Sequence, residues 1–450
     1  MFGNDLILPK KLVKEYNKTR PEFNRSLPIC LAPYKSLRFL PDGNITVCCH
    51  NNSWSLGVFP QMSILDAWHS GELIKIRKRI SKADFSYGCY ECLPAYLNKN
   101  FSSVNPKLYE NFETHNDFPI ILDFKIATEC NLECVMCSEY SSSSIQKSCN
   151  SENLKATIFG KDFVNQVSEI IPYLKEAKFS GGEPFLNNIY YEIWDLLIER
   201  NPKCKISVQT NGTILNQKII TLLESGNFHI NVSVDSANPK VYQEIRRNGD
   251  YNKLLENLKY FATYSKKKNV LLGITSCNMR DNVYELPGVL KLANVLNAKL
   301  WYSDVYFPLV NSLWVLNSFE LTRFVDFLES QSFESGNDLY NHNINVYKDM
   351  ISRIKNFVIQ AKRREEKSQY VSVEKLINDL KKVFNRNIKS NEELWSRIEF
   401  VLKNIGAHKM IDLAKEIKKY YKVDFVYTQL NLMSDEQLRS NFECLKIGVE

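Results

Sequence analysis

Six short apolar runs, rich in β-branched and aromatic residues, alternate along the middle of the chain with segments of helical period. Such alternation requires parallel strands joined by crossover helices, because a tight turn cannot link two parallel strands. The pattern predicts an α/β sheet or barrel, and six units are too few for a closed eight-stranded barrel. The predicted strands are residues 121–127, 177–180, 205–209, 229–235, 270–276 and 299–306. Helices are predicted over residues 160–176, 189–199, 217–224, 239–264 and 283–296.

Directly after the first predicted strand come Cys130, Cys134 and Cys137, in the segment ECNLECVMC. They supply three thiolates, one fewer than the four that complete an ordinary iron–sulfur cluster. A four-iron cluster held by three cysteines leaves one iron free to bind a small molecule. A zinc knuckle or three unrelated buried thiols would also account for these residues, but their close spacing after a strand favours a cluster.

This C-x3-C-x2-C motif resembles that of the radical S-adenosylmethionine (SAM) superfamily, and the resemblance covers about residues 118–308. It implies a partial (β/α)6 barrel and a 4Fe–4S cluster on the three cysteines, whose open iron binds SAM. Reductive cleavage of SAM would give a 5′-deoxyadenosyl radical that abstracts hydrogen from a substrate C–H bond. The resemblance further implies a reductant such as flavodoxin or ferredoxin.

A four-residue motif lies where the family would hold SAM. Gly181, Gly182, Glu183 and Pro184 follow the second predicted strand and match the family's GGEP element. In the family this element binds the methionyl amino group of SAM through its backbone and its glutamate. Glycine lets a backbone approach a ligand closely, and a carboxylate accepts from an ammonium group, although the motif alone is also typical of a tight turn.

Polar residues at later strand ends complete the SAM site that the resemblance implies. Asn211 follows the third predicted strand, and Ser233 and Asp235 lie on the fourth, where the serine commonly touches ribose. Arg246 matches a basic residue that often pairs with the SAM carboxylate, and Arg247 beside it leaves that assignment open. An ordinary Asn-Gly turn and helix capping are the alternative explanations of these residues.

Another group of cysteines precedes the predicted barrel: Cys30, Cys48, Cys89 and Cys92. Apolar residues alternate on both sides of a Pro-Asp-Gly turn at residues 41–43 and predict a hairpin, and a Ser-capped helix is predicted after it.

Together with the C-x12-G-x4-C spacing, these elements resemble the SPASM/twitch accessory module of radical SAM enzymes, in the shorter version that holds one auxiliary 4Fe–4S cluster. This module usually follows the barrel, whereas here it comes first. Cys49 adjoins Cys48, which leaves the choice of ligand ambiguous, and four thiolates would satisfy zinc equally well.

These observations predict four segments. They are a cysteine-rich hairpin and helix module at residues 1–94, a polar linker at 95–117, the partial barrel at 118–310 and a mainly helical region at 311–450. Cys277 is a further cysteine of interest, because it lies near the carboxyl end of the fifth predicted strand, where the active sites of such barrels open.

The composition is that of an ordinary globular protein, with 450 residues of which 44% are hydrophobic and 24% charged. We expect no membrane segment and no signal peptide, because neither a long apolar run nor the pattern of a cleaved leader is present. Twelve cysteines without a secretion signal indicate reduced thiols and metal ligation, and hence a cytoplasmic protein. The net charge of +7 is explained by a lysine-rich surface better than by nucleic-acid binding.

By analogy with family members that carry such modules, we expect an enzyme that modifies a peptide or protein. Oxidation or epimerisation of a sugar or nucleotide-linked carbohydrate is the alternative, and a small-molecule substrate of this kind would take the place of the peptide. Outside this class stands a non-catalytic iron–sulfur or zinc scaffold. An intact GGEP element beside three cysteines favours the enzyme, because a scaffold has no need of a SAM site.

Overall fold

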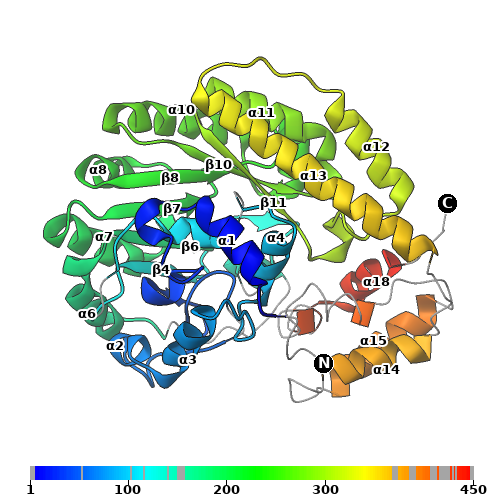
Figure 1. The fold of residues 1–450 in the computed structure, drawn as a ribbon. Helices are drawn as coiled ribbons and strands as arrows, with labels where there is room; N and C mark the ends of the chain where they lie inside the picture. Colours follow the sequence, from blue (N-terminus) through cyan, green and yellow to red (C-terminus); the bar gives the residue numbers. More distant parts are fainter. Residues whose placement is uncertain are drawn as a thin grey trace. The chain divides into compact units, whose positions relative to one another are not determined.

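A computed structural model of the chain divides into two compact units, which are described separately below (Figure 1). The first comprises Met1–Asn131, Tyr140–Thr210 and Ile214–His229, and the second comprises Leu132–Glu139, Asn211–Thr213 and Ile230–Glu450. The structure describes residues 6–51, 54–101, 104–114, 117–138, 141–148, 158–366, 373–384, 392–405, 413–414, 426–427, 430 and 433–445.

The first unit is built on a mainly parallel sheet that includes the first three predicted barrel strands. Its elements are β1 Ser36–Phe39, β2 Asn44–Thr46, β3 Gly57–Val58, β4 Ile121–Ala127, α6 Lys161–Ile170, β6 Glu176–Gly181, α7 Asn188–Arg200, β7 Lys205–Thr210 and α8 Gln217–Ser225. The strand order is β7-β6-β4-β1-β2-β3. Phe124 of β4 stacks on Phe179 of β6, with ring centroids 4.9 Å apart. These rings contact Phe163 of α6 and Trp194 of α7, so both helices cover the same face of the sheet (Figure 1).

The predicted hairpin is confirmed as β1 and β2, which pair antiparallel. Gly43 in its turn has a φ of +85°, and a side chain there would lie 2.4 Å from the carbonyl oxygen of Phe59, so the turn requires glycine. The sequence did not predict a second pairing of β1, which is parallel to β4, with Leu37 opposite Leu122. The cysteine-rich module and the barrel strands therefore share one sheet.

A buried ion pair crosses the junction between β1 and β4. Arg38 lies opposite Asp123 in the strand register, and its Nη1 donates to the carboxylate. Each side chain is only 10% exposed. Because side chains alternate along a strand and Phe124 faces α6 and α7, Asp123 points to the other face of the sheet. The pair thus links the two parts on the face of the sheet opposite α6 and α7.

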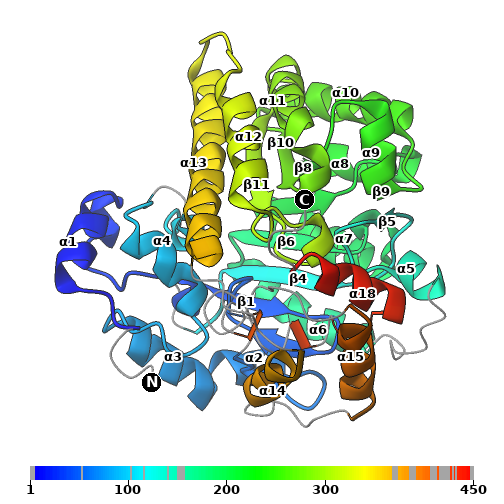
Figure 2. The same ribbon diagram turned by 90° about the vertical axis from the view of Figure 1, so that its right-hand side faces the viewer.

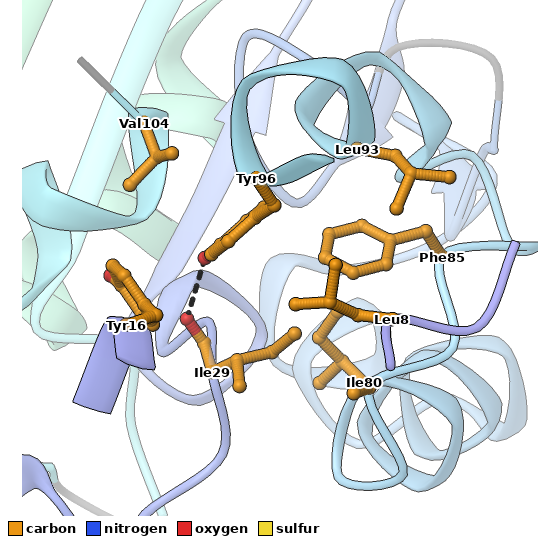
Figure 3. Close-up of a cluster of buried hydrophobic side chains, with 9 residues drawn as sticks. Leu8, Tyr16, Ile29, Ile80, Phe85, Leu93, Tyr96 and Val104 are labelled. Carbon is orange, nitrogen blue, oxygen red and sulfur yellow. Dashed lines mark hydrogen bonds between the residues drawn. The ribbon is translucent and has the colours of Figure 1, made fainter. Parts of the chain in front are cut away.

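The rest of the amino-terminal module packs around one hydrophobic cluster (Figure 3). Its helices are α1 Lys10–Lys18, α2 Ile64–Trp68, α3 Gly71–Ile80 and α4 Leu93–Leu97. The predicted serine cap of α2 is confirmed, since Ser63 Oγ accepts from the backbone N–H of Asp66 at 3.1 Å. Within the cluster, Tyr96 Oη donates to the carbonyl oxygen of Ile29 at 3.0 Å.

Part of the segment expected as a linker is a packed element of the first unit. Tyr109 and Glu110 are each 2% exposed, at the end of the short helix η4 Asn105–Tyr109. Glu110 accepts from Arg20 Nε at 2.7 Å and from Tyr16 Oη at 2.8 Å. Segment boundaries at residues 94, 117 and 310 stay a prediction.

The second unit holds the last three predicted strands, which pair in parallel. Its elements are β5 Glu133–Cys134, β8 Phe228–Ser233, α9 Pro239–Ile245, β9 Arg246–Arg247, α10 Tyr251–Lys268, β10 Gly273–Asn278, α11 Leu286–Val295 and β11 Lys299–Asp304. The single helix predicted over residues 239–264 is wrong, because it is interrupted by β9. Asn248 has a left-handed φ of +68°, and Asp250 caps a new helix by accepting from the backbone N–H of Asn252 at 2.9 Å.

The region after residue 310 is mainly helical where the structure describes it, as predicted. Its helices are α12 Ser318–Glu329, α13 Asp338–Glu366, α14 Val373–Phe384, α15 Glu392–Ile405 and α18 Asp435–Glu443. α13 lies alongside α11 and α12 (Figure 1), and its Asn343 accepts from the backbone N–H of Leu300 in β11 at 2.9 Å. Among the helices that the structure describes, none is long and apolar enough to cross a membrane.

The Arg38–Asp123 pair gives a prediction for stability. Asp123→Ala leaves a buried arginine without its partner, and we expect it to lower the free energy of unfolding by about 3–5 kcal/mol. The double variant Arg38→Met, Asp123→Leu should regain most of that loss, because a packed apolar pair replaces the charges. Urea unfolding followed by tryptophan fluorescence measures both.

Glu244→Ala is the control, since its ion pair with Lys240 is exposed and exposed pairs contribute little. An Asp123→Ala variant no less stable than this control would show that the pair does not hold the junction.

Candidate functional site

The GGEP element lies against the segment that leads into the first cysteine of the triplet, within the first unit. The backbone N–H of Gly182 donates to Ala127 O at 2.8 Å, and that of Glu183 donates to Glu129 O at 2.6 Å. Gly181 has a φ of +132°, and a side chain on it would lie 2.3 Å from Ala127 O. One on Gly182 would lie 2.2 Å from Glu129 O. Both glycines are therefore required, because their backbone closely approaches that of residues 127–129, which directly precede Cys130.

The carboxylate of Glu183 is fully buried and held in place by two donors. Its Oε1 accepts from Thr210 Oγ1 at 2.8 Å and from the backbone N–H of Phe185 at 3.2 Å. Pro184 is the first residue of the short helix η6 Pro184–Leu186, which this carboxylate caps. Thr210, at the end of β7, is a supporting residue that sequence reasoning missed, although its position at a strand end was a usable signal.

Cys130 is held by serines that follow it in the chain. Its backbone N–H donates to Ser143 Oγ at 3.1 Å, and its carbonyl oxygen accepts from Ser144 Oγ at 2.8 Å. Both serines open the helix α5 Ser143–Ser148. The run of four serines at 141–144 was visible in the sequence, but its contact with the cysteine loop was not predicted.

The other two cysteines of the triplet belong to the second unit, where Cys134 is paired with Arg246. β5 and β9 form a two-stranded antiparallel ribbon in which these residues are opposite each other. Arg246 Nη1 donates to Cys134 Sγ at 3.8 Å. Cys137 closes a tight turn, since its backbone N–H donates to Cys134 O at 2.9 Å.

Arg246 is also ion-paired with Asp235, another predicted SAM contact. Nη2 of the arginine lies 2.8 Å from Asp235 Oδ2, and both side chains are buried. Burial opposes the charge of Arg246, but Asp235 and then Cys134 raise its pKa above the usual range. Oδ1 of Asp235 accepts from the backbone N–H of Cys277 at 2.7 Å, so the carboxylate is fixed on two sides.

The remaining predicted SAM contacts lie at strand ends of the second unit. Asn211 is buried, and its Oδ1 accepts from the backbone N–H of Thr213 at 2.9 Å and from Thr213 Oγ1 at 2.7 Å. Ser233 is the last residue of β8 and lies opposite Thr275 of β10. Their roles toward SAM stay predictions.

The predicted auxiliary ligands gather in one region of the first unit. Cys30, Cys89 and Cys92 pack against the hydrophobic cluster of the amino-terminal module. Burial raises the pKa of Cys30 and of Cys89 to about 12. The pKa values of Cys48 and Cys92 are well above the usual range, mainly because both thiols are buried. Neighbouring thiols raise both pKa values further, namely Cys30, Cys49 and Cys89.

Asn51 is a polar neighbour of this region that the sequence did not reveal. Its Nδ2 donates to Cys89 Sγ at 3.3 Å and to the carbonyl oxygen of Tyr87 at 2.9 Å. Cys48 is buried and Cys49 is half-buried, so the choice of ligand between them is still open.

The auxiliary cysteines and Cys130 lie toward opposite ends of β4. Ser36 lies opposite Ile121, where β4 begins. Its Oγ donates to the carbonyl oxygen of Val47, the residue before Cys48, at 2.7 Å. Cys130 follows the other end of the strand. At roughly 3.3 Å per residue, the seven residues of β4 span about 20 Å. Accordingly, α4, which follows Cys92, and α5, which holds Cys130, lie beyond opposite ends of β4 (Figure 2).

The auxiliary cysteines fit ligation of an iron–sulfur cluster or of zinc. Buried thiols with raised pKa values ionise when a metal ion compensates the thiolate charge, and thiolate is the preferred ligand of iron–sulfur clusters and zinc. Beside Cys134, the buried Nε of Arg246 has no hydrogen-bond partner among the residues that the structure describes. Among the described residues, no three His, Cys, Asp or Glu side chains converge on the position of a single metal ion.

Two segments of the chain match models of known protein families. Residues 124–283 match the family model of the radical SAM superfamily, and residues 30–93 match that of the SPASM iron–sulfur cluster-binding domain. The two matched segments contain all seven proposed cysteine ligands.

Three curated relatives illustrate the similarity. A GTP 3′,8-cyclase of Limosilactobacillus fermentum is 29% identical over 170 residues, which are 36% of this chain and 46% of that protein. A cysteine-type anaerobic sulfatase-maturating enzyme of Clostridium novyi is 28% identical over 176 residues, 35% of this chain and 45% of that protein. The mycofactocin maturase MftC of Mycolicibacterium smegmatis is 26% identical over 199 residues, 43% of this chain and 47% of that protein.

The chain thus spans about half the length of these relatives. The cysteine triplet, the GGEP element beside it and the two family matches agree with one another. Residues 30–93 of this chain therefore form a SPASM iron–sulfur domain that precedes a radical SAM domain at residues 124–283.

Proposed function

We propose that this radical SAM enzyme abstracts a hydrogen atom from a C–H bond of a peptide or protein substrate after reductive cleavage of SAM. The observation that carries the SAM part is the hydrogen bonding of Gly182 and Glu183 to the backbone that leads into Cys130. This contact brings the element that would hold the methionyl end of SAM next to the first proposed cluster ligand. For SAM to ligate one iron of the cluster, the element that holds SAM and the cysteine ligands must lie close together.

In this proposal Cys130, Cys134 and Cys137 hold the SAM-site cluster, which supplies the electron for cleavage of the carbon–sulfur bond when it is bound and reduced. Glu183 accepts from the methionyl ammonium group, and Thr210 orients its carboxylate. The electron comes from an external reductant of the flavodoxin or ferredoxin kind.

The peptide substrate is supported by the SPASM domain and by two relatives whose names describe maturation: the sulfatase-maturating enzyme and the mycofactocin maturase. A nucleotide substrate is the second candidate, since another relative is named a GTP cyclase. Because the cyclase and the maturases are similar to this chain at nearly the same identity, 26–29%, a direct test separates the two substrate classes.

The auxiliary cluster, in our proposal, transfers electrons and does not bind substrate. Four thiolates complete the coordination of a four-iron cluster and leave no open iron. Their location toward the start of β4 supports this role, because active sites of such α/β folds open at the carboxyl ends of the strands.

Replacing Cys130, Cys134 and Cys137 with alanine should abolish formation of 5′-deoxyadenosine, because no cluster remains to reduce SAM. The iron content should fall from about eight to about four per chain, since the auxiliary cluster is retained. Anaerobic reconstitution, iron analysis and chromatography of the products measure this. Cys444→Ala, which removes a thiol at the end of α18, is the control. Formation of 5′-deoxyadenosine by the triple variant would contradict the assignment of the cluster.

The substrate class is tested by adding either GTP or a short peptide encoded beside this chain's gene to the reduced enzyme with SAM. We expect the peptide to increase formation of 5′-deoxyadenosine and to change in mass, while GTP is unchanged. Consumption of GTP coupled to SAM cleavage would establish the nucleotide candidate instead.

Replacing Cys30, Cys48, Cys89 and Cys92 with alanine should remove the second cluster, spare SAM cleavage and stop product formation. The metal lost separates the two ligation chemistries: loss of about four irons indicates a cluster, and loss of one zinc indicates a structural site. A variant without this cluster that turns over substrate at the normal rate would reduce the module to a folding element.

A further inference from the structure

We propose that Arg246 and Asp235 form a charge-compensated support for Cys134, through which the arginine raises the reduction potential of the SAM-site cluster. The inference rests on the proposed function in one respect, that Cys134 is a cluster ligand. It differs from the role that family resemblance suggests for Arg246, which is direct pairing with the SAM carboxylate.

Backbone pairing brings Cys134 and Arg246 together. Cys134 and Arg246 are directly opposite each other in the β5–β9 ribbon, and the neighbouring backbone N–H of Val135 donates to Ile245 O at 2.9 Å. A side chain on one strand therefore meets a side chain on the other. The 3.8 Å contact of Nη1 with Cys134 Sγ follows from this register.

Asp235 fixes the other side of the guanidinium. Its Oδ2 lies 2.8 Å from Nη2 of Arg246, and the aspartate itself is 0% exposed. Asn282 Nδ2 donates to both Asp235 O and Cys277 O at 2.8 Å, so the backbone around the aspartate is also tied down. The arginine is consequently aimed at the cysteine and has little freedom to turn elsewhere.

Arg246 and Asp235 are buried, 6% and 0% exposed, and residues beside the pair in the sequence form a small hydrophobic cluster. Ile245 and Met279 are buried in a small hydrophobic cluster, against which Val135, Met136 and Cys277 pack. A hydrogen bond from a charged donor to a thiolate is strong in such a medium. Hydrogen bonds to the ligating sulfurs and net charge near the cluster are among the factors that set its potential.

The two charges should act in opposite directions. The positive charge and N–H of Arg246 stabilise the more negative, reduced cluster and raise its potential, whereas the carboxylate of Asp235 offsets part of this effect. Two terminal nitrogens of the guanidinium are already engaged by Cys134 and Asp235, which leaves Nε as the atom without a hydrogen-bond partner. Because Nη1 and Nη2 are both engaged, these contacts favour a positioning role for Arg246 over a bidentate ion pair with the SAM carboxylate.

The test uses the full-length, reconstituted enzyme without SAM and measures the midpoint potential of each cluster by redox titration followed by EPR. The SAM-site cluster is identified as the one whose EPR signal changes when SAM is added. We expect Arg246→Met to shift its potential to more negative values and Asp235→Asn to shift it to more positive values. Arg247→Met is the matched control, because that neighbouring arginine is exposed and should leave the potential unchanged.

Each alternative has its own outcome. If Arg246 only pairs with the SAM carboxylate, Arg246→Met leaves the potential unchanged and weakens SAM binding in calorimetry, as Glu183→Gln is expected to do. If the pair is merely structural, both variants lose iron from the triplet or shift the potential in the same direction. Either result overturns the inference.

Where Arg246→Met alone loses iron from the triplet, Arg246→Lys, which keeps the positive charge, should retain the cluster and give a potential slightly below that of the wild type. Failure of the proposed function itself is distinguishable, since it would appear as a triplet variant that still cleaves SAM, a readout independent of these potentials.

Discussion

The pairing of β4 with β1 on one side and β6 on the other is the interaction on which the first unit depends. Because all three strands run in the same direction, β4 defines which motif lies at which end of the sheet. Its carboxyl end leads into Cys130 and meets the GGEP backbone. Near its amino end lie the hairpin residues that carry Cys48. One strand thus separates the auxiliary cysteines from Cys130, and the buried Arg38–Asp123 pair crosses the junction between β1 and β4.

Much of this could be predicted from the sequence, because the signals were local. Periodicity located all six barrel strands, and the Pro-Asp-Gly turn located the hairpin that precedes Cys48. The spacing of the cysteines indicated two metal sites, and the family matches agree with both. The glycines of the GGEP element were predicted to permit a close approach, and the structure shows that Gly181 and Gly182 approach the backbone at residues 127–129.

The rest depended on contacts between distant segments, which periodicity does not encode. The sequence of a four-residue strand such as β1 does not indicate which strand pairs with its other edge, so the parallel pairing of β1 with β4 was missed. The helix expected over residues 239–264 was predicted from apolar spacing alone, and the Asn-Gly-Asp sequence at 248–250 that ends it received too little weight. That break creates β9, and with it the position of Arg246 opposite Cys134. The supporting roles of Thr210 and of the serines at 143 and 144 likewise appear only once the chain is folded.

We expect the auxiliary cluster near the start of β4, whereas Cys130, the first proposed ligand of the SAM-site cluster, follows the other end of this strand. Magnetic dipolar coupling between the two reduced clusters, measured by pulsed EPR, tests this most directly. The account predicts weak coupling, as expected for clusters separated by about the 20 Å length of a seven-residue strand or more. Strong exchange coupling, which requires the clusters to be close together, would contradict it.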